Sequence, residues 1–322
     1  IKYGCFKSDV CPKLNTYIYF VKIMPVFVQL LRVRFNGGDI LKKAMEKEKF
    51  RFISDLITCQ TEMLGGKSKA LEELYDLCDN DEKESLVKQL LVDFSEMDDD
   101  VYSLCLEDMS RYIVNKGFPL AECMVVAMCH DHLADSSQEV LQDIKLPLEL
   151  KNFPNKNYCN RADQCFKKSD KAIKHFFIVD DFVGSGHTVD TRIKSLDQKA
   201  NGREYSLHFV IVAGMEHAIR SLREDGVDIY CSYTVKRGIT DRYANEHVDG
   251  KLALMAAMES HLAARINQTD LSLYNFGYRQ SEAIFTRKNR NVPNNVFPIF
   301  WWKKDRQDNP RTTLYHRVQD GY

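Results

Sequence analysis

The sequence carries almost no net charge, because 45 Lys and Arg residues are balanced by 46 Asp and Glu, which leaves −1 at neutral pH. A chain without an excess of either sign has no overall attraction to nucleic acid or to an anionic membrane. Internal repeats and low-complexity segments are also lacking. With 322 residues and an ordinary hydrophobic content of 44%, the chain is typical of a globular protein of about two domains.

A long uninterrupted apolar run is missing as well. The most apolar stretch, residues 17–35, is interrupted by Lys22, Pro25 and Arg32. It is too short and too charged for a transmembrane helix, and no small-residue cleavage site of a signal peptide follows it. We therefore expect no membrane association and interpret the stretch as a buried segment or a partner-binding element.

The ten cysteines do not form a dense framework of the kind that disulfide-rich proteins have. Two pairs, Cys5/Cys11 and Cys159/Cys165, have five intervening residues, which is no standard zinc spacing. Free thiols in a reducing, cytoplasmic compartment fit this scatter best. A metal site built from Cys129, His130 and His132 is the disfavoured alternative.

One stretch, residues 176–192, carries the most chemical information. An apolar run at 176–179 predicts a buried strand, and Asp180 and Asp181 follow directly at its end. A short turn with two glycines and two hydroxyls comes next, and a helix is predicted to begin near its last residue. The residues of the turn are Gly184, Ser185, Gly186, His187 and Thr188.

This turn has the features of an anion site. Its two glycines allow the backbone N–H groups to approach a ligand closely. The helix that follows directs its free N–H groups and the positive end of its dipole toward the same place. Because Asp180 and Asp181 would repel a phosphate, we expect them to face sugar hydroxyls or a metal ion instead.

The whole pattern resembles the signature of type I phosphoribosyltransferases. The resemblance implies that Asp180 and Asp181 are the catalytic carboxylates, which hold the ribose 2- and 3-hydroxyls of phosphoribosyl pyrophosphate and reach Mg²⁺ through that ligand. It places the 5-phosphate on the loop Gly184–Thr188, where His187 occupies the variable position. The alternative is an ordinary strand-to-helix turn. A P-loop is disfavoured because His187 stands where that motif has Lys.

Two further segments are candidates for the pyrophosphate. A second core strand is predicted at 122–129, and the resemblance implies a pyrophosphate loop after it, which here contains Asp135, Ser136 and Ser137 but no basic residue. These three residues could equally cap the helix that follows. Lys236 and Arg237 come after a strand predicted at 227–235 and are a second candidate, or else a solvated charge pair in a turn.

The order of strands and helices predicts an α/β fold. Strands at 122–129, 176–179, 208–213 and 227–235, separated by helices, indicate a parallel, Rossmann-like sheet of phosphoribosyltransferase type. A mainly helical N-terminal region is expected before it, and residues 151–172 are expected to form a surface loop. The predicted organisation is 1–118 helical, 119–302 phosphoribosyltransferase-like and 303–322 a basic C-terminal arm.

A second resemblance lies near the C-terminus. Gly277-Tyr278, Ser281-Glu282-Ala283, Pro293-Asn294-Asn295 and Pro298-Ile299-Phe300-Trp301 are similar to a divergent phosphoribosyltransferase-like family of bacterial conflict and anti-phage loci, which includes retron effectors. We read residues 281–285 as a strand. The resemblance implies transfer of phosphoribosyl to, or cleavage of, a nucleotide or nucleic-acid target. The alternative is a non-catalytic nucleotide-sensing or scaffold subunit.

The partners that this resemblance implies are phosphoribosyl pyrophosphate or another ribose phosphate, a complex of reverse transcriptase and nucleic acid, and a second copy of the chain. The basic C-terminus, where Trp301, Trp302 and Tyr315 interleave with Lys and Arg, suits single-stranded nucleic acid. The alternative is a solvated arm with Trp301 in the core.

Overall fold

A computed structural model describes residues 40–130 and 135–318 of the chain, which divides into two compact units, Ile1–Glu48 and Lys49–Tyr322. The apolar stretch at 17–35 and the pair Cys5/Cys11 lie outside the described residues. Of the first unit only the beginning of helix α2 (Ile40–Cys59) is described. The domain boundaries at 118/119 and 302/303 stay predictions.

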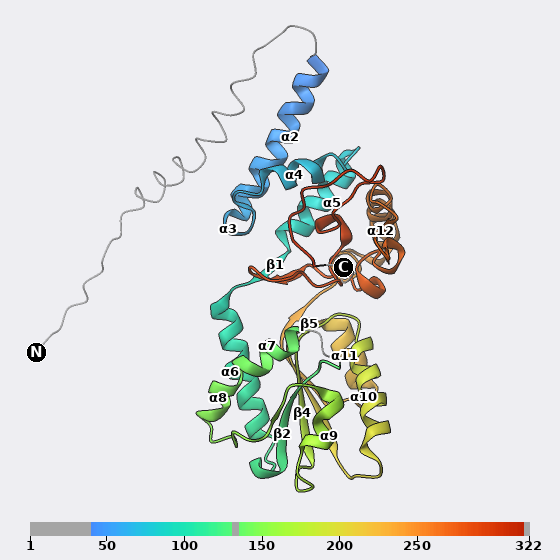
Figure 1. The fold of residues 1–322 in the computed structure, drawn as a ribbon. Helices are drawn as coiled ribbons and strands as arrows, with labels where there is room; N and C mark the ends of the chain where they lie inside the picture. The colour runs from blue at the N-terminus through green and yellow to red at the C-terminus, as the bar shows by residue number, and fades with distance from the viewer. Residues whose placement is uncertain (1–39, 131–134, 319–322) are drawn as a thin grey trace, which may run out of the picture. The chain divides into compact units, whose positions relative to one another are not determined.

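A five-stranded sheet forms the centre of the second unit (Figure 1). Its strand order is β3-β2-β4-β5-β6, and every neighbouring pair is parallel. The strands are β2 (Cys123–Ala127), β3 (Tyr158–Cys159), β4 (His175–Val183), β5 (Ser206–Met215) and β6 (Ile229–Val235). The predicted α/β fold with a parallel sheet is confirmed.

Helices cover both faces of this sheet, as its apolar strands require. In Figure 1, α6 and α8 lie on one side of the strands, and α10 and α11 lie on the other. The helices around the sheet are α6 (Asp99–Asn115), α7 (Ser136–Asp143), α8 (Lys145–Glu149), α9 (Cys165–Lys168), α10 (His187–Ala200) and α11 (Glu216–Glu224). Because all strands are parallel, the loops after β2, β4 and β6 meet at one edge of the sheet.

The helical N-terminal region folds together with the C-terminal segment. Strand β1 (Ser95–Met97) pairs in parallel with β9 (Phe285–Arg287), and α5 packs on α12. The core here includes Trp301 and Trp302, which are 1% and 0% exposed. The other elements of this part are α3 (Thr61–Leu64), α4 (Ser68–Tyr75), α5 (Asp81–Val92), α12 (Asn245–Glu259), β7 (Arg265–Ile266) and β8 (Thr269–Asp270).

Short 3-10 helices connect several of these elements. They are Leu120–Glu122, Ala162–Gln164, Leu271–Leu273, Tyr278–Gln280 and Pro298–Phe300.

Three sequence-based expectations differ from the structure. Residues 151–172 are not simply a surface loop, since they contribute β3 to the sheet and bury Cys159 and Cys165. The strand predicted at 281–285 is wrong, because β9 begins only at Phe285, and of the preceding residues Ala283 alone forms an isolated bridge, with Val296. Residues 303–318 are not a solvated arm, because Leu314 and Tyr315 are buried.

A chain of polar groups at the opposite edge of the sheet attaches α6 to the strands. The Ser206 hydroxyl lies 2.8 Å from Nε2 of His208, and Nδ1 of His208 lies 2.6 Å from Asp228. Asp228 also accepts hydrogen bonds from Tyr112 and Lys116 of α6. These groups, of which His208 is buried and the others are partly buried, satisfy one another and hold α6 against β5 and β6.

The eight cysteines among the described residues are all free thiols. In that same part of the chain, no helix is long and apolar enough to cross a membrane.

Candidate functional site

The two adjacent carboxylates lie near the end of β4, at the carboxyl edge of the sheet. Asp180 accepts a hydrogen bond from the backbone N–H of Asp181 at 2.9 Å. Asp181 in turn accepts one from the Ser136 hydroxyl at 2.7 Å. Ser136 is the first residue of α7, which follows β2, so the structure brings two of the predicted segments into direct contact.

Both carboxylates have raised pKa values. Burial, followed by the charges of Asp181 and Asp135, holds the pKa of Asp180 well above its ordinary value. Burial also raises the pKa of Asp181, while the Ser136 hydroxyl and, more weakly, the Arg287 guanidinium oppose that shift. Carboxyl groups with perturbed pKa values at a sheet edge are typical of ligand sites, because a ligand can supply the hydrogen-bond donors or the cation that the protein does not provide.

This arrangement makes Asp180→Asn a stabilising substitution. A carboxyl whose pKa is raised by folding binds more protons in the folded state, so its ionisation destabilises the fold above about pH 4. We expect the variant to gain about 1 to 2 kcal/mol of unfolding free energy at neutral pH, and the gain to vanish in acid. Urea unfolding at several pH values measures the difference, and Asp249→Asn, at an exposed position, is the control. A lower unfolding free energy of Asp180→Asn than of wild type at neutral pH would contradict this expectation.

The loop after β4 leads into α10 through Gly186. Gly186 has φ of 80°, in the left-handed region that favours glycine, and it precedes the first helical residue without any side-chain cap. The Asp190 N–H makes a helical bond to the Gly186 carbonyl. The N–H groups of the first turn therefore face outward beside Ser185, as an anion site requires.

Gly184 is needed for a different reason, which is space. A Cβ atom on Gly184 would lie 2.0 Å from Cγ and Nδ2 of Asn295. The Asn295 amide is itself held by Ser281 Oγ at 3.0 Å and by the Tyr278 carbonyl at 3.3 Å. The C-terminal segment thus packs directly on the backbone of the loop, and a stacked pair of rings, Phe182 and Phe285, adds to this contact.

The segment Asp135–Ser137 acts mainly as a helix cap. Asp135 accepts a hydrogen bond from the Ser137 N–H at 2.8 Å, and Ser137 Oγ accepts one from the Cys129 N–H. Ser137 is fully buried, so of the three residues only Ser136 reaches the carboxylate pair. The alternative interpretation as a cap for α7 therefore holds for Asp135, while the Ser137 side chain binds the backbone after β2.

The disfavoured metal site of Cys129, His130 and His132 is only partly described, because His132 lies outside the described residues. Cys129 itself is buried and its thiol donates to the Asn160 carbonyl. Residues 40–130 and 135–318 contain no group of three or more His, Cys, Asp or Glu side chains that could hold a metal ion.

The second candidate pair is tied into its own turn. Arg237 forms an ion pair with Asp241 at 2.8 Å, and its backbone N–H donates to the same carboxylate. Lys236 is exposed. The turn is closed by Glu282, which accepts hydrogen bonds from the N–H groups of Ile239 and Thr240.

Sequence reasoning missed a buried cation in the site. Arg192 of α10 is 8% exposed, and in the part of the chain that the structure describes its Nε has no hydrogen-bond partner. Burial lowers the pKa of its guanidinium, whereas the Cys129 thiol and the carboxyl groups of Asp180, Asp135 and Asp163 act in the opposite direction. A basic residue of α10 therefore supplies positive charge that the loop at 135–137 lacks. In the sequence, Arg192 is a single Arg on the buried face of the helix that follows the glycine loop, and nothing else marks it.

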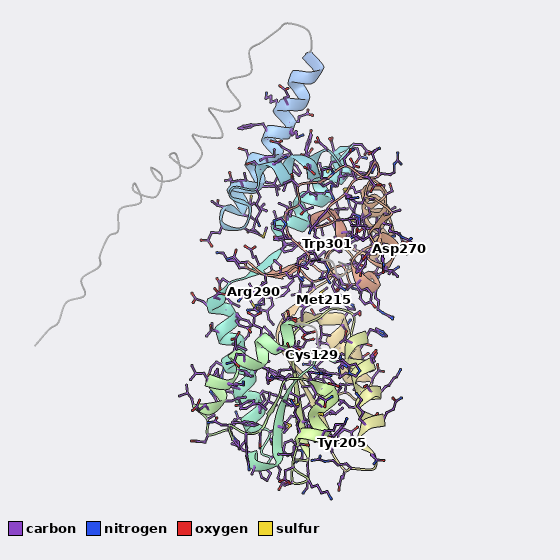
Figure 2. All side chains as sticks on the ribbon, in the orientation of Figure 1. Cys129, Tyr205, Met215, Asp270, Arg290 and Trp301 are labelled. Carbon is purple, nitrogen blue, oxygen red and sulfur yellow. The ribbon has the colours of Figure 1, made fainter. Side chains whose placement is uncertain are left out.

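Cys129 follows β2, and Met215 is the last residue of β5. Figure 2 shows both of them at one end of the strands and Tyr205 at the other end. A parallel sheet with a carboxylate pair and a glycine loop at that edge defines a protein of phosphoribosyltransferase-type fold. The chain belongs to the PRTase-CE family, whose model matches residues 69–317.

The chain is similar to orotate phosphoribosyltransferase from Aeropyrum pernix, with 20% identity, 41% of this chain and 70% of that chain covered, and a TM-score of 0.29. The HGPRT-ase from Leishmania tarentolae in complex with GMP is 13% identical, with 43% of this chain and 76% of that chain covered and a TM-score of 0.28. A hypothetical protein from Neisseria gonorrhoeae with bound ppGpp is 10% identical, with 44% of this chain and 85% of that chain covered and a TM-score of 0.31. Such low TM-scores carry no argument about this chain. No curated protein matches it.

Proposed function

We propose that this protein binds phosphoribosyl pyrophosphate at the carboxyl edge of its sheet. The 5-phosphate occupies the loop Gly184–Thr188, and Asp180 and Asp181 accept hydrogen bonds from the ribose 2- and 3-hydroxyls. One observation carries the proposal: a short loop joins the end of β4, which bears the carboxylate pair, to the uncapped start of α10. The first suits a diol and the second suits a phosphate.

The reaction that this placement supports is transfer of the phosphoribosyl group. The bond between the anomeric carbon and pyrophosphate breaks, pyrophosphate leaves with the electron pair, and the acceptor forms the new bond and loses a proton. The protein contributes orientation and electrostatics, with the loop fixing one end of the sugar and the carboxylates the other. Arg192 adds positive charge beside Asp180.

Mg²⁺ fits this site as an ion carried by the ligand. Carboxylate oxygens are the ligands that Mg²⁺ prefers, and the ion typically binds through one or two of them together with substrate phosphates. Asp180 and Asp181 can contribute to such a site, but the described residues do not offer a complete protein shell. When bound, the ion would neutralise charge on the departing pyrophosphate.

Calorimetric titration of phosphoribosyl pyrophosphate with Mg²⁺ tests the proposal. We expect Asp180→Asn/Asp181→Asn to bind about 100-fold more weakly than wild type, because each hydrogen bond to a charged group contributes about 1.5 to 3 kcal/mol. Asp249→Asn, which removes an exposed carboxylate of α12, should bind like wild type. Absence of binding by the wild-type protein would refute the proposal.

The acceptor is proposed from the resemblance to conflict-system proteins, which favours a nucleotide or nucleic-acid target in anti-phage defence, in the cytoplasm. Release of pyrophosphate in the presence of nucleobases, nucleotides or oligonucleotides would identify an enzyme and its acceptor class.

A sensor or scaffold subunit, associated with a reverse transcriptase and nucleic acid, is the second candidate. The observation that favours it is that Asp135 caps α7 and Ser137 accepts a hydrogen bond from the Cys129 N–H, so neither side chain is free for pyrophosphate. A sensor would bind phosphoribosyl pyrophosphate without releasing pyrophosphate from it.

A further inference from the structure

A cavity of about 590 Å³ lies between the start of α4 and the C-terminal residues, and one of its lining residues, Arg287, is also the guanidinium that acts on Asp181. Its walls come from residues 66–70, Glu96, 287–291, 312–316 and Val318. The volume falls in the range of about 300 to 1,000 Å³ that small-molecule sites have. No sequence motif pointed to this place.

Positive charge dominates the cavity. Its lining contains Lys67, Lys69, Arg287 and Arg290 but only one carboxylate, Glu96. Lys67 pairs loosely with Glu96 at 3.9 Å, and Arg290 pairs with Glu139 at 2.7 Å. Lys69 is exposed and makes no ion pair within residues 40–130 and 135–318. Burial lowers the pKa of Lys67, as expected of an ammonium group that lacks a strong partner.

The cavity wall also offers two kinds of neutral hydrogen-bond donor, backbone N–H groups and a hydroxyl. Helix α4 begins after Lys67 without a side-chain cap, so its first N–H groups remain available to an anion. Tyr315 is 6% exposed, and its hydroxyl has no hydrogen-bond partner among residues 40–130 and 135–318. A buried hydroxyl without a partner costs free energy that a bound acceptor would recover.

We propose that this cavity binds a small molecule that carries two or more phosphate groups. Ammonium and guanidinium groups, an uncapped helix start and an unpaired hydroxyl are all donors, and phosphate oxygens are acceptors that match them. The proposal does not depend on the phosphoribosyl pyrophosphate site.

A single-stranded nucleic acid suits the cavity less well, because such ligands need free aromatic faces on which bases stack. The Tyr315 ring is stacked on Phe94 at 4.7 Å, and the Lys67 Nζ lies over it at 4.6 Å. Trp301 and Trp302 are buried in the core. The aromatic residues that made nucleic acid attractive in the sequence are therefore occupied.

Inorganic tripolyphosphate is the probe for a calorimetric test. We expect wild type to bind it, and Lys67→Gln/Lys69→Gln to bind about tenfold more weakly or worse, since charge-assisted hydrogen bonds are lost. Lys156→Gln/Lys171→Gln removes the same charge from exposed positions on the sheet side and should leave the affinity unchanged. Tyr315→Phe removes only the hydroxyl, so it should fold normally and still weaken binding severalfold.

A further variant distinguishes the two proposed sites experimentally. Asp180→Asn/Asp181→Asn should retain tripolyphosphate binding at the cavity even where it loses phosphoribosyl pyrophosphate. Wild-type affinity in both Lys67→Gln/Lys69→Gln and Tyr315→Phe would overturn the cavity proposal. So would binding of a single-stranded oligonucleotide without any binding of tripolyphosphate.

Discussion

Gly184→Ala is expected to lose about 3 kcal/mol of unfolding free energy, the upper part of the range for overpacking a closed site. The new Cβ would lie 2.0 Å from Cγ and Nδ2 of Asn295, so one of the two groups must move. Displacing Asn295 breaks its bonds to Ser281 and Tyr278, and displacing the loop disturbs the proposed phosphate site. We therefore expect urea unfolding at a lower midpoint and loss of phosphoribosyl pyrophosphate binding together.

A matched glycine tests whether the effect is steric. Gly250 lies within α12, where an added Cβ meets nothing within 4 Å, so Gly250→Ala should gain about 0.5 to 1 kcal/mol from helix propensity. Removing the obstacle should also rescue the site: in an Asn295→Ala background, Gly184→Ala should cost at least about 1.5 kcal/mol less. Strictly additive effects of the two substitutions would contradict the contact.

The sequence was sufficient for the local part of the site. The strand, the carboxylate pair and the glycine turn lie within fourteen consecutive residues, so the backbone geometry of one strand-to-helix connection brings them together. The buried apolar strands likewise revealed the parallel sheet. Predictions of this kind depend on neighbours in the chain, whose relative positions the local conformation fixes.

The partners contributed by distant segments were not accessible in the same way. Ser136 reaches Asp181 across the sheet, and Asn295 reaches Gly184 from the C-terminal segment. Nothing in the composition of these segments encodes the register of such contacts. Asn295 was part of a recognised motif, but its role became visible only from the missing space beside Gly184.

The C-terminal motif is unusual in its backbone. Phe276, Arg279, Gln280 and Glu282 all have positive φ, between 50° and 57°, although none of them is glycine. Each such conformation costs about 1 to 3 kcal/mol and persists only where the surroundings hold it. Local preferences alone favoured a strand at 281–285, and the hydrogen bonds of the buried Glu282 and Glu259 side chains explain why the backbone before Phe285 is irregular instead.

Glu282→Ala is the second substitution for which we expect a large effect, about 3 to 5 kcal/mol of unfolding free energy. Glu282 is 4% exposed, and its carboxylate accepts hydrogen bonds from the N–H groups of Ile239 and Thr240 and from the Thr240 hydroxyl. Alanine would leave these buried donors without an acceptor and would leave the strained residue without its anchor. Urea unfolding measures the loss.

Glu282→Gln separates the charge from the shape of this anchor. The amide keeps one acceptor oxygen but presents an N–H₂ group to at least one of the donors, so we expect roughly half of the alanine effect. Glu224→Ala, at an exposed position in the last turn of α11, should stay within about 0.5 kcal/mol of wild type. If Glu282→Ala were equally mild, the turn at 238–240 would be stable by itself. The C-terminal motif would then be a neighbour of the sheet edge rather than the element that holds its loops in place.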